Sequence, residues 1–317
     1  MIRQCVAVLL IAGMTAVASG ADRIHFLIPG GAGGGWDTTA RGVGEALARS
    51  GIIKVASYEN LSGGGGARAL AYLIETAGRQ ENTLMISSSP IILRSLRKMY
   101  PQSFHDLTPV ASVVVDYGAF VVKADSPYQD WQDLIDDFSA NPRRVNVAGG
   151  SSRASMDHIV AALAFRKSGV DAKQLKYIPY NAGGHAMVGL LSGETQVLST
   201  GLSEAIALAE QGEVRILAMT AAERLDRFPG IRTLAEQGVP AVFANWRGFF
   251  AAPGATSEQL EQFEDALSRM YATDEWRIIR DNRGWTDFYL SGDGFAAFLA
   301  AQEKEMEELL DELGLLN

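Results

Sequence analysis

Short apolar runs alternate with longer amphipathic segments along most of the chain beyond residue 22. The apolar runs have the length of buried strands, and the segments between them repeat apolar residues at helical spacing. Strands that alternate with helices in this way are typical of an α/β fold with an open sheet. We expect strands at residues 24–28, 53–58, 83–86, 145–148, 175–180 and 197–199. Helices are predicted at residues 38–49, 67–76, 155–168 and 185–191, with a further helix that ends at 211.

Two groups of these strand–helix units are separated by a different stretch of sequence. Adjacent strands are predicted there at residues 110–115 and 119–123, and a short strand at 249–252 follows the second group. Three helices come last, at about residues 257–272, 274–282 and 293–313. We therefore predict two lobes, each an open, mostly parallel sheet flanked by helices, with two crossover segments as a hinge. Lobe 1 would contain residues 22–121 and 248–317, and lobe 2 would contain residues 122–247.

The first 21 residues have the pattern of a secretory signal peptide. A basic start at Arg3 precedes an apolar run at residues 6–17, and small residues then offer cleavage sites of the A-x-A kind. The run is short for a membrane span, although an uncleaved anchor is the alternative. The one cysteine, Cys5, lies in this segment, so the mature protein would contain none. We therefore expect an exported protein, cleaved after residue 21, in the periplasm of a bacterium.

The glycines are the feature of the composition that bears most on function. The chain has 33 glycines, and most Gly/Ser clusters follow a predicted strand and precede a predicted helix. Loops in that position line the ligand crevice of an open α/β sheet. Glycine lets backbone N–H groups approach a ligand, and the next helix directs its N–H groups to the same place. Several such helix ends would bind an anion although the formal net charge is −9, a charge that argues against nucleic acid as a partner.

Motifs for nucleotide binding, hydrolysis and metal binding are not met. The first glycine-rich loop continues with Trp36, so it contains neither G-x-G-x-x-G nor the Lys-Ser/Thr of a P-loop. The nucleophile elbow G-x-S-x-G nearly occurs twice but ends in Arg153 and Ala205, which leaves an exported hydrolase as an alternative only. No H-x-x-x-H pair occurs, and a single cysteine excludes a Cys-clustered zinc site. We assign no catalytic residue, no metal and no cofactor.

Several motifs, taken in order along the chain, are similar to those of one known family. They include Gly33-Gly34-Gly35-Trp36-Asp37, Ala244-Asn245-Trp246-Arg247-Gly248 and Arg283-Gly284-Trp285-Thr286-Asp287. The chain resembles the tripartite tricarboxylate transporter substrate-binding family, also called the Bug family of periplasmic solute receptors. In these motifs it looks most like the tricarboxylate-binding branch. The resemblance covers essentially the whole mature chain.

The resemblance implies a two-lobed periplasmic-binding-protein fold, type II-like, and a receptor rather than an enzyme. Such a receptor would capture a small carboxylate, citrate or another tri- or dicarboxylate, and deliver it to the membrane permease subunits of a tripartite transporter. We expect it to act as a monomer; the alternatives are the exported hydrolase and a ligand sensor for a membrane kinase. The ligand-binding residues carried over from the family are Gly33, Gly34, Gly35, Trp36, Asp37, Ser87, Ser88, Ser89, Ser151, Ser152, Arg153, Asn181, Gly183, Gly184, Thr200 and Gly201.

Four positions each allow two interpretations. Arg153 would pair with a ligand carboxylate or lie at the surface without a role. Asp37 would cap the following helix or accept a hydrogen bond from the ligand. Trp36 would cover the ligand or pack between loop and helix. His185, where relatives often carry an acidic residue, would tune the pH dependence of binding or simply begin a helix.

Overall fold

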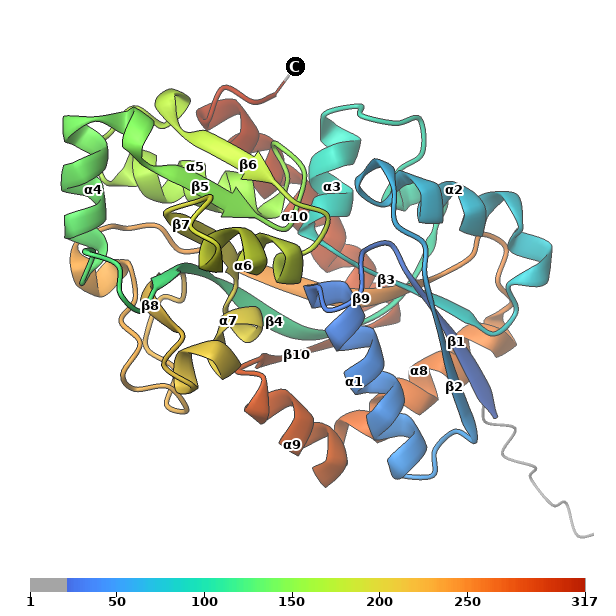
Figure 1. Ribbon diagram of the computed structural model, residues 1–317. Coiled ribbons are helices and arrows are strands. Elements are labelled where there is room, and N and C mark those ends of the chain that lie inside the picture. Colours follow the sequence, from blue (N-terminus) through green and yellow to red (C-terminus); the bar gives the residue numbers. More distant parts are fainter. Residues whose placement is uncertain (1–21, 317) are drawn as a thin grey trace, which may run out of the picture.

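The computed structural model describes residues 22–316 and shows two lobes that share one sheet (Figure 1). The predicted signal peptide lies outside the described residues. The strands are β1 (Arg23–Ile28), β2 (Val55–Asn60), β3 (Thr83–Ser88), β4 (Thr108–Lys123), β5 (Asn146–Gly149), β6 (Lys176–Pro179), β7 (Val197–Gly201), β8 (Val214–Met219), β9 (Ala244–Ala251) and β10 (Thr286–Ser291). The helices are α1 (Gly35–Arg49), α2 (Ala67–Glu75), α3 (Ser89–Leu96), α4 (Trp131–Ala140), α5 (Met156–Lys167), α6 (Gly183–Leu191), α7 (Leu202–Glu210), α8 (Ser257–Tyr271), α9 (Asp274–Asn282) and α10 (Gly292–Glu312).

The sheet is mixed, with the order β2-β1-β3-β9-β4-β7-β5-β6, and β8 and β10 also pair with β4. β1 is parallel to β2 and β3, and β5 is parallel to β6 and β7, as expected for strand–helix units. β4 and β9 run antiparallel to the strands beside them. Parallel strands therefore form the outer part of each lobe, and antiparallel strands form the part where the lobes meet. Below, lobe 1 denotes the side of β1–β3 and lobe 2 the side of β5–β8.

β4 is a single strand of 16 residues, where the sequence predicts two. Its first part pairs with β9 and β10, and from Gly118 onward it pairs with β7 and β8. Asp116 and Gly118 suggest a turn by composition, but Asp116 is buried and paired with Arg247. A Cβ atom at Gly118 would lie 2.9 Å from Val160 Cγ1, so the glycine permits close packing rather than a turn. β4 thus crosses between the lobes, and the residue limits given for the lobes in the sequence analysis remain a prediction.

Three apolar clusters hold the layers together. In lobe 1, one cluster joins the sheet to α1, α8 and α9 and includes Phe26 and Trp276. In lobe 2, a second cluster lies beneath α6 and α7 and includes Leu190. The third extends through both lobes and contains Trp246, whose ring packs edge-on against Phe295 of α10. The strands that carry the site loops are therefore anchored in rigid packing on both sides of the cavity between the lobes.

The C-terminal helix contacts both lobes. α10 packs on α3 and β4, and Lys167 of α5 donates a hydrogen bond to Glu312 at 3.0 Å. Just beyond α3, Arg97 Nε donates to the carbonyl oxygen of Leu315 at 3.1 Å. Strands β8 and β10 are absent from the sequence prediction; β10 is partly exposed and pairs with β4 through an irregular register. Within residues 22–316 we find no helix with the length and apolar character of a membrane span.

Candidate functional site

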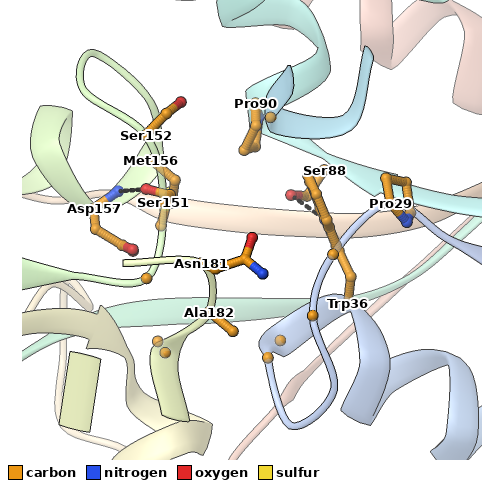
Figure 2. A pocket seen from close by; sticks show the side chains of 18 of the residues that line it. Pro29, Trp36, Ser88, Pro90, Ser151, Ser152, Met156, Asp157, Asn181 and Ala182 are labelled. Atoms are coloured by element: carbon orange, nitrogen blue, oxygen red, sulfur yellow. Dashed lines mark hydrogen bonds between the residues drawn. The ribbon is translucent and has the colours of Figure 1, made fainter. Parts of the chain in front are cut away.

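A cavity of about 270 Å³ lies between the lobes, at the carboxyl ends of the parallel strands (Figure 2). Its wall consists largely of the loops that follow β1, β3, β5, β6 and β7. Parallel strands end at the same edge of a sheet, which is why loops far apart in sequence meet here. The sequence-predicted residues that line the cavity are Gly34, Gly35, Trp36, Ser88, Ser151, Ser152, Asn181, Gly183 and Gly201.

The remaining predicted residues lie near the cavity without lining it: Gly33, Asp37, Ser87, Ser89, Arg153, Gly184 and Thr200. Ser87 and Ser89 are buried behind the wall, one on each side of Ser88 along the chain. Thr200 directs its hydroxyl at the Glu204 carboxylate, 2.5 Å away, and Gly184 is exposed on α6. These positions support the wall or face the solvent, and direct ligand contact remains a prediction for them.

Asp37 belongs to the first turn of α1 and is not its N-cap, because the helix begins earlier than predicted, at Gly35. The Asp37 carboxylate accepts hydrogen bonds from the backbone N–H of Gly33 at 2.9 Å, from Arg41 Nε at 2.8 Å and from Asn60 Nδ2 at 3.0 Å. Both carboxylate oxygens are therefore engaged within lobe 1. Asp37 thus fixes the shape of the loop after β1.

Arg153 and His185 have exposed side chains and do not line the cavity. His185 lies in the first turn of α6, which begins at Gly183. Trp36 does line the cavity. The indole Nε1 donates a hydrogen bond to Ser88 Oγ at 2.9 Å (Figure 2). The ring thus forms part of the wall and joins the start of α1 to the end of β3.

Five helices, α1, α3, α5, α6 and α7, begin at the cavity wall, and no N-cap side chain bonds its own helix there. Three of the N-cap residues are Gly34, Ala182 and Gly201, which have no side-chain oxygen. The other two are serines whose hydroxyls are used elsewhere: Ser88 accepts from Trp36, and Ser155 accepts from Arg94. The first turns therefore keep N–H groups available to the cavity.

Three helices that begin away from the cavity are capped in the usual way, whereas Ser291 at the start of α10 makes no such bond. The N-cap side chains of α4, α8 and α9 are Asp130, Thr256 and Thr273, and each accepts a hydrogen bond from its own first turn. Three N–H groups at these helix starts are also satisfied. Ser151 Oγ accepts from the N–H of Asp157 at 3.1 Å, Glu204 accepts from the N–H of Gly201 at 3.2 Å, and Asp116 accepts from the N–H of Ser203 at 3.4 Å. The other uncapped first turns at the cavity present partial positive charge, which favours an anion.

Arg247 of β9 lines the cavity in a closed network of hydrogen bonds. Its side chain is 3% exposed, and its guanidinium contacts the Asp116 carboxylate of β4 closely. It also donates to Thr39 Oγ1 at 2.7 Å, while Ser203 of α7 donates its hydroxyl to Asp116 at 2.7 Å. A Cβ atom at Gly35 would lie 2.5 Å from Arg247 Nη2, so this network also requires the glycine at the start of α1. The charge of Arg247 is therefore compensated within the protein.

Arg94 of α3 lines the cavity in a different electrostatic setting. It is also 3% exposed, but its Nη2 donates to two hydroxyls, Ser155 Oγ at 3.0 Å and Ser152 Oγ at 3.4 Å. Within residues 22–316, no carboxylate oxygen lies within 4.0 Å of this guanidinium, and its Nε has no hydrogen-bond partner. Burial lowers the pKa of Arg94, which the nearby Tyr100 and Asp157 oppose, and the group stays cationic at neutral pH.

The loop that covers Arg94 is built from glycine. Residues Gly64–Gly66 form a short 3₁₀ turn before α2, and Gly63 to Gly66 all have positive φ. A Cβ atom at Gly65 would lie 2.7 Å from Arg94 Nε. Glycine is thus required here both for the backbone conformation and for the close approach to the guanidinium.

Two acidic side chains complete the polar lining. Burial, with a smaller contribution from the neighbouring Glu204, raises the pKa of Asp157 to about 7, against the effect of hydrogen bonds from Ser151 and the Gly150 N–H. Burial also raises the pKa of Glu204, against the effect of the Thr200 hydroxyl and Arg247. Both carboxyl groups lie in the first turn of a helix, α5 and α7 respectively.

The lobes touch each other across the cavity. Arg94 belongs to lobe 1, and the two serines that accept its hydrogen bonds belong to lobe 2. A Cβ atom at Gly31 would lie 3.2 Å from the carbonyl oxygen of Asn181, so the loops after β1 and β6 are also in close contact. Within lobe 2, a Cβ atom at Gly150 would overlap the backbone of Ala182 and Gly183. The arrangement is one in which both lobes would enclose a small solute.

Sequence reasoning missed the charged residues of the site, although two of them carry a signal. Asp116 is a lone charge within the apolar run Val113–Val122, and Arg94 directly follows Ile91-Ile92-Leu93 on the buried side of α3. A charge in such a position is rarely buried unless it has a partner or a function. Asp157 and Glu204 carry a weaker signal, since an acidic residue in the first turn of a helix is common.

Residues 38–315 of the chain match the protein family described as "Tripartite tricarboxylate transporter family receptor". A relative from Cupriavidus necator, described as "UPF0065 protein in gbd 5'region", is 27% identical over 259 residues, which cover 81% of this chain and 77% of the relative.

Two solved structures from Rhodopseudomonas palustris have the same fold. Rpa4515 with adipate has a TM-score of 0.84 at 23% identity and covers 92% of this chain and 97% of its own. MatC with bound malate has a TM-score of 0.80 at 21% identity and covers 91% and 99% respectively. At these identities the likeness concerns the fold, and it confirms the two-lobed α/β architecture predicted from the sequence.

Proposed function

The chain belongs to the tripartite tricarboxylate transporter receptor family, and on this premise we propose that it is a periplasmic receptor for a small carboxylate. The solute is captured between the two lobes and delivered to the membrane permease subunits of a tripartite transporter. The protein acts as a monomer after its signal peptide is cleaved. The observation that carries the proposal is Arg94, a buried cation without a carboxylate partner among the described residues, in a cavity where five helices begin.

The magnitudes support a site shared among many groups. A micromolar receptor needs about 8 kcal/mol of binding free energy. One helix N-terminus contributes about 0.3–1 kcal/mol to the binding of an anion, and up to about 2 kcal/mol when partly buried. A hydrogen bond to a charged group contributes about 1.5–3 kcal/mol. Neither is sufficient alone, but Arg94 together with several uncapped helix ends supplies the required order of magnitude.

Closure of the lobes follows from the same geometry. Arg94 already bridges the cavity by donating to Ser155 of the opposite lobe. A carboxylate bound at the guanidinium would contact both lobes and so stabilise their closed arrangement over an open one. The relatives solved with adipate and malate support a carboxylate as the solute. Citrate, suggested by the motifs of the tricarboxylate-binding branch, falls within this class.

The experiment that tests this proposal is a thermal-shift panel on the mature protein. The panel contains citrate, succinate, malate, adipate, aromatic acids and amino acids, with succinamide as an uncharged control for succinate. A ligand present at 100 times its Kd stabilises the folded state by about 2.7 kcal/mol, which raises Tm by several degrees. We expect at least one carboxylate to raise Tm while succinamide does not, and no chemical change in the ligand afterwards. A panel in which no carboxylate raises Tm contradicts the proposal.

A further inference from the structure

The loop after β5 presents the two serines that accept hydrogen bonds from Arg94. Ser152 Oγ and Ser155 Oγ lie 3.4 and 3.0 Å from the same nitrogen, Arg94 Nη2, although two residues separate these serines in the chain. A tight turn brings them together, because the N–H of Ser155 donates to the carbonyl oxygen of Ser152 at 3.1 Å. The contact between Arg94 and the opposite lobe therefore depends on the shape of this turn.

The third residue of this turn, Ala154, has a backbone conformation that is unusual for its residue type. Its φ is +53°, and within residues 22–316 only one other residue besides the glycines has a positive φ. Glycine is the usual residue where a turn needs positive φ at its third position, because a Cβ atom disfavours the left-handed region. Ala154 is also buried, at 4% exposed. A contact from outside the turn must therefore hold it in this conformation.

His158 of α5 provides that contact. Its Nδ1 accepts a hydrogen bond from the Ala154 N–H at 2.8 Å, so the proton of the neutral ring is on Nε2. The imidazole packs against the Tyr177 ring of β6, with 4.8 Å between the ring centroids. Burial, with smaller contributions from the charges of Arg153 and Arg97, lowers the pKa of His158 to about 4. The imidazole is therefore neutral at neutral pH and keeps its acceptor nitrogen.

The position of His158 in its helix explains why it reaches the turn. It is the third residue of α5, where a Glu or Gln normally accepts a hydrogen bond from the N-cap N–H. The N-cap is Ser155, whose N–H and hydroxyl are already engaged in the turn and with Arg94. His158 instead accepts from the residue before the N-cap, Ala154. A neutral imidazole does this without placing a carboxylate next to the turn that Arg94 contacts, as a Glu would.

We propose that His158 is a positioning residue of the solute site. By accepting from the Ala154 N–H, it holds the turn in the conformation in which both serines meet Arg94. When the lobes close on a carboxylate at Arg94, the turn is already in place, so less of the binding free energy is used to order it. This inference rests on the proposed function and assigns a role in it to a histidine that does not itself line the cavity.

The test first removes the acceptor. His158→Phe keeps an aromatic ring beside Tyr177 but cannot accept a hydrogen bond, whereas His158→Gln keeps an acceptor at this helix position. Calorimetric titration measures the affinity for the carboxylate that raises Tm most in the thermal-shift panel. Without support, a residue with a Cβ atom adopts the left-handed conformation in roughly a tenth of the molecules, so His158→Phe should weaken binding by about tenfold. His158→Gln should bind within about threefold of the wild type, because the acceptor is retained.

A second substitution in the His158→Phe background separates positioning from packing. Glycine adopts positive φ without the cost of a Cβ atom, so Ala154→Gly should return the affinity to within about threefold of the wild type. Ala172→Gly, at a lobe 2 residue whose φ is not positive, is the control and should restore nothing. Circular dichroism verifies folding. The double variant contains no strained residue at the turn, so its affinity tests the inference even if His158→Phe alone does not fold.

The outcomes separate the inference from the proposed function. If His158→Phe binds the carboxylate as tightly as the wild type, the inference is wrong and the carboxylate receptor stands. The inference is also wrong if His158→Gln loses as much affinity as His158→Phe, or if Ala154→Gly restores no binding, because His158 then acts through packing alone. If the wild type binds no carboxylate of the panel, the proposed function fails and the inference fails with it.

Discussion

Two buried arginines line the same cavity, and their surroundings differ. Arg94 and Arg247 are each 3% exposed. Arg247 is paired with Asp116 and bonded to Thr39, so its charge is compensated inside the protein. Arg94 has only hydroxyl acceptors, and within the described residues no carboxylate oxygen lies within 4.0 Å of it. One arginine holds the walls together, while the other keeps its charge available to a ligand. An acidic chain thereby presents a local cation without a basic surface.

The helix N-termini divide in the same manner. The helices α4, α8 and α9 begin away from the cavity and are capped by Asp130, Thr256 and Thr273. At the cavity, Ser88 and Ser155 occupy the N-cap position of α3 and α5 but direct their hydroxyls to Trp36 and Arg94. Residues that would normally stabilise a helix end are used to build the wall. Arg94 thus lacks the carboxylate partner that Arg247 has. Ser88 and Ser155 likewise do not bond their own helices, as the caps of α4, α8 and α9 do, although the uncapped start of α10 shows that this is not confined to the cavity.

The largest expected effect is a difference in stability between variants of the two arginines. Arg247→Ala leaves the Asp116 carboxylate, 1% exposed, without its cation, and should lower the free energy of unfolding by about 3–5 kcal/mol. Arg94→Ala leaves no carboxylate unpaired, so it should destabilise the protein less. Chemical denaturation of both variants measures the difference. Equal destabilisation by the two substitutions would show that the arginines do not have separate roles.

Substitution of Gly150 in the cavity wall should destabilise the protein nearly as much. The Cβ of Gly150→Ala would overlap the backbone of Gly183, and backbone cannot swing aside as a side chain can. We expect a loss of about 1–3 kcal/mol in unfolding free energy, as for other overpacked sites. Gly294→Ala in the first turn of α10 is the matched control, because a Cβ there meets nothing within 4 Å. If denaturation midpoints of Gly150→Ala and Gly294→Ala agree, the close packing of the lobe 2 loops is refuted.

The acidic side of the cavity should give stability a pH dependence. The pKa of Asp157 rises from 3.8 to about 7 on folding, chiefly through burial, so the folded state binds this proton more tightly than the unfolded state. Its contribution to stability is therefore complete below pH 4 and is lost as the pH rises toward 7. Asparagine does not titrate, so the Asp157→Asn variant does not lose stability in this way as the pH rises. Its free energy of unfolding relative to that of the wild type should therefore increase by up to about 1.4 kcal/mol per pH unit over that range. A difference that stays constant between pH 4 and 7 would contradict the shift.

The smallest expected effect on ligand affinity is that of Arg153, which was predicted from the sequence to be a ligand-binding residue. Arg153 is exposed and lies outside the cavity wall. Arg153→Ala should change solute affinity less than twofold, because an exposed charge at this position is screened by solvent. A tenfold loss on calorimetric titration would place Arg153 in the site after all and would weaken the distinction drawn for Arg94.

Much of the fold could be predicted from the sequence because its signals are local. The alternation of apolar runs and amphipathic segments gave the parallel units, and the glycine-rich loops gave the position of the cavity. The course of β4 could not be predicted, because Asp116 and Gly118 are residues typical of a turn. That they lie within a strand depends on their contacts with Arg247 and Val160, which are distant in sequence. Tertiary contacts override local composition at such positions.

The parts of the candidate site that the backbone of the loops forms were predicted from the sequence, whereas its buried charged side chains were missed. Trp36, Ser88 and Gly183 line the cavity as expected, because loops at strand ends converge by topology. Asp37 was predicted as a helix cap because α1 was expected to begin at residue 38, whereas it begins at Gly35. Arg94 lies five residues beyond the predicted Ser89, within a helix, and only the packing of α3 against the opposite lobe brings it to the cavity.

The most direct test of the account is a calorimetric titration of wild type and Arg94→Ala with the tightest-binding carboxylate of the thermal-shift panel. The exposed Arg143 of lobe 2, which does not line the cavity, provides the control variant Arg143→Ala. Loss of a charged hydrogen bond of about 1.5–3 kcal/mol should weaken binding by about tenfold to a hundredfold in Arg94→Ala and leave Arg143→Ala unchanged. A folded Arg94→Ala protein that binds the carboxylate as tightly as the wild type would contradict the proposal that Arg94 binds the solute.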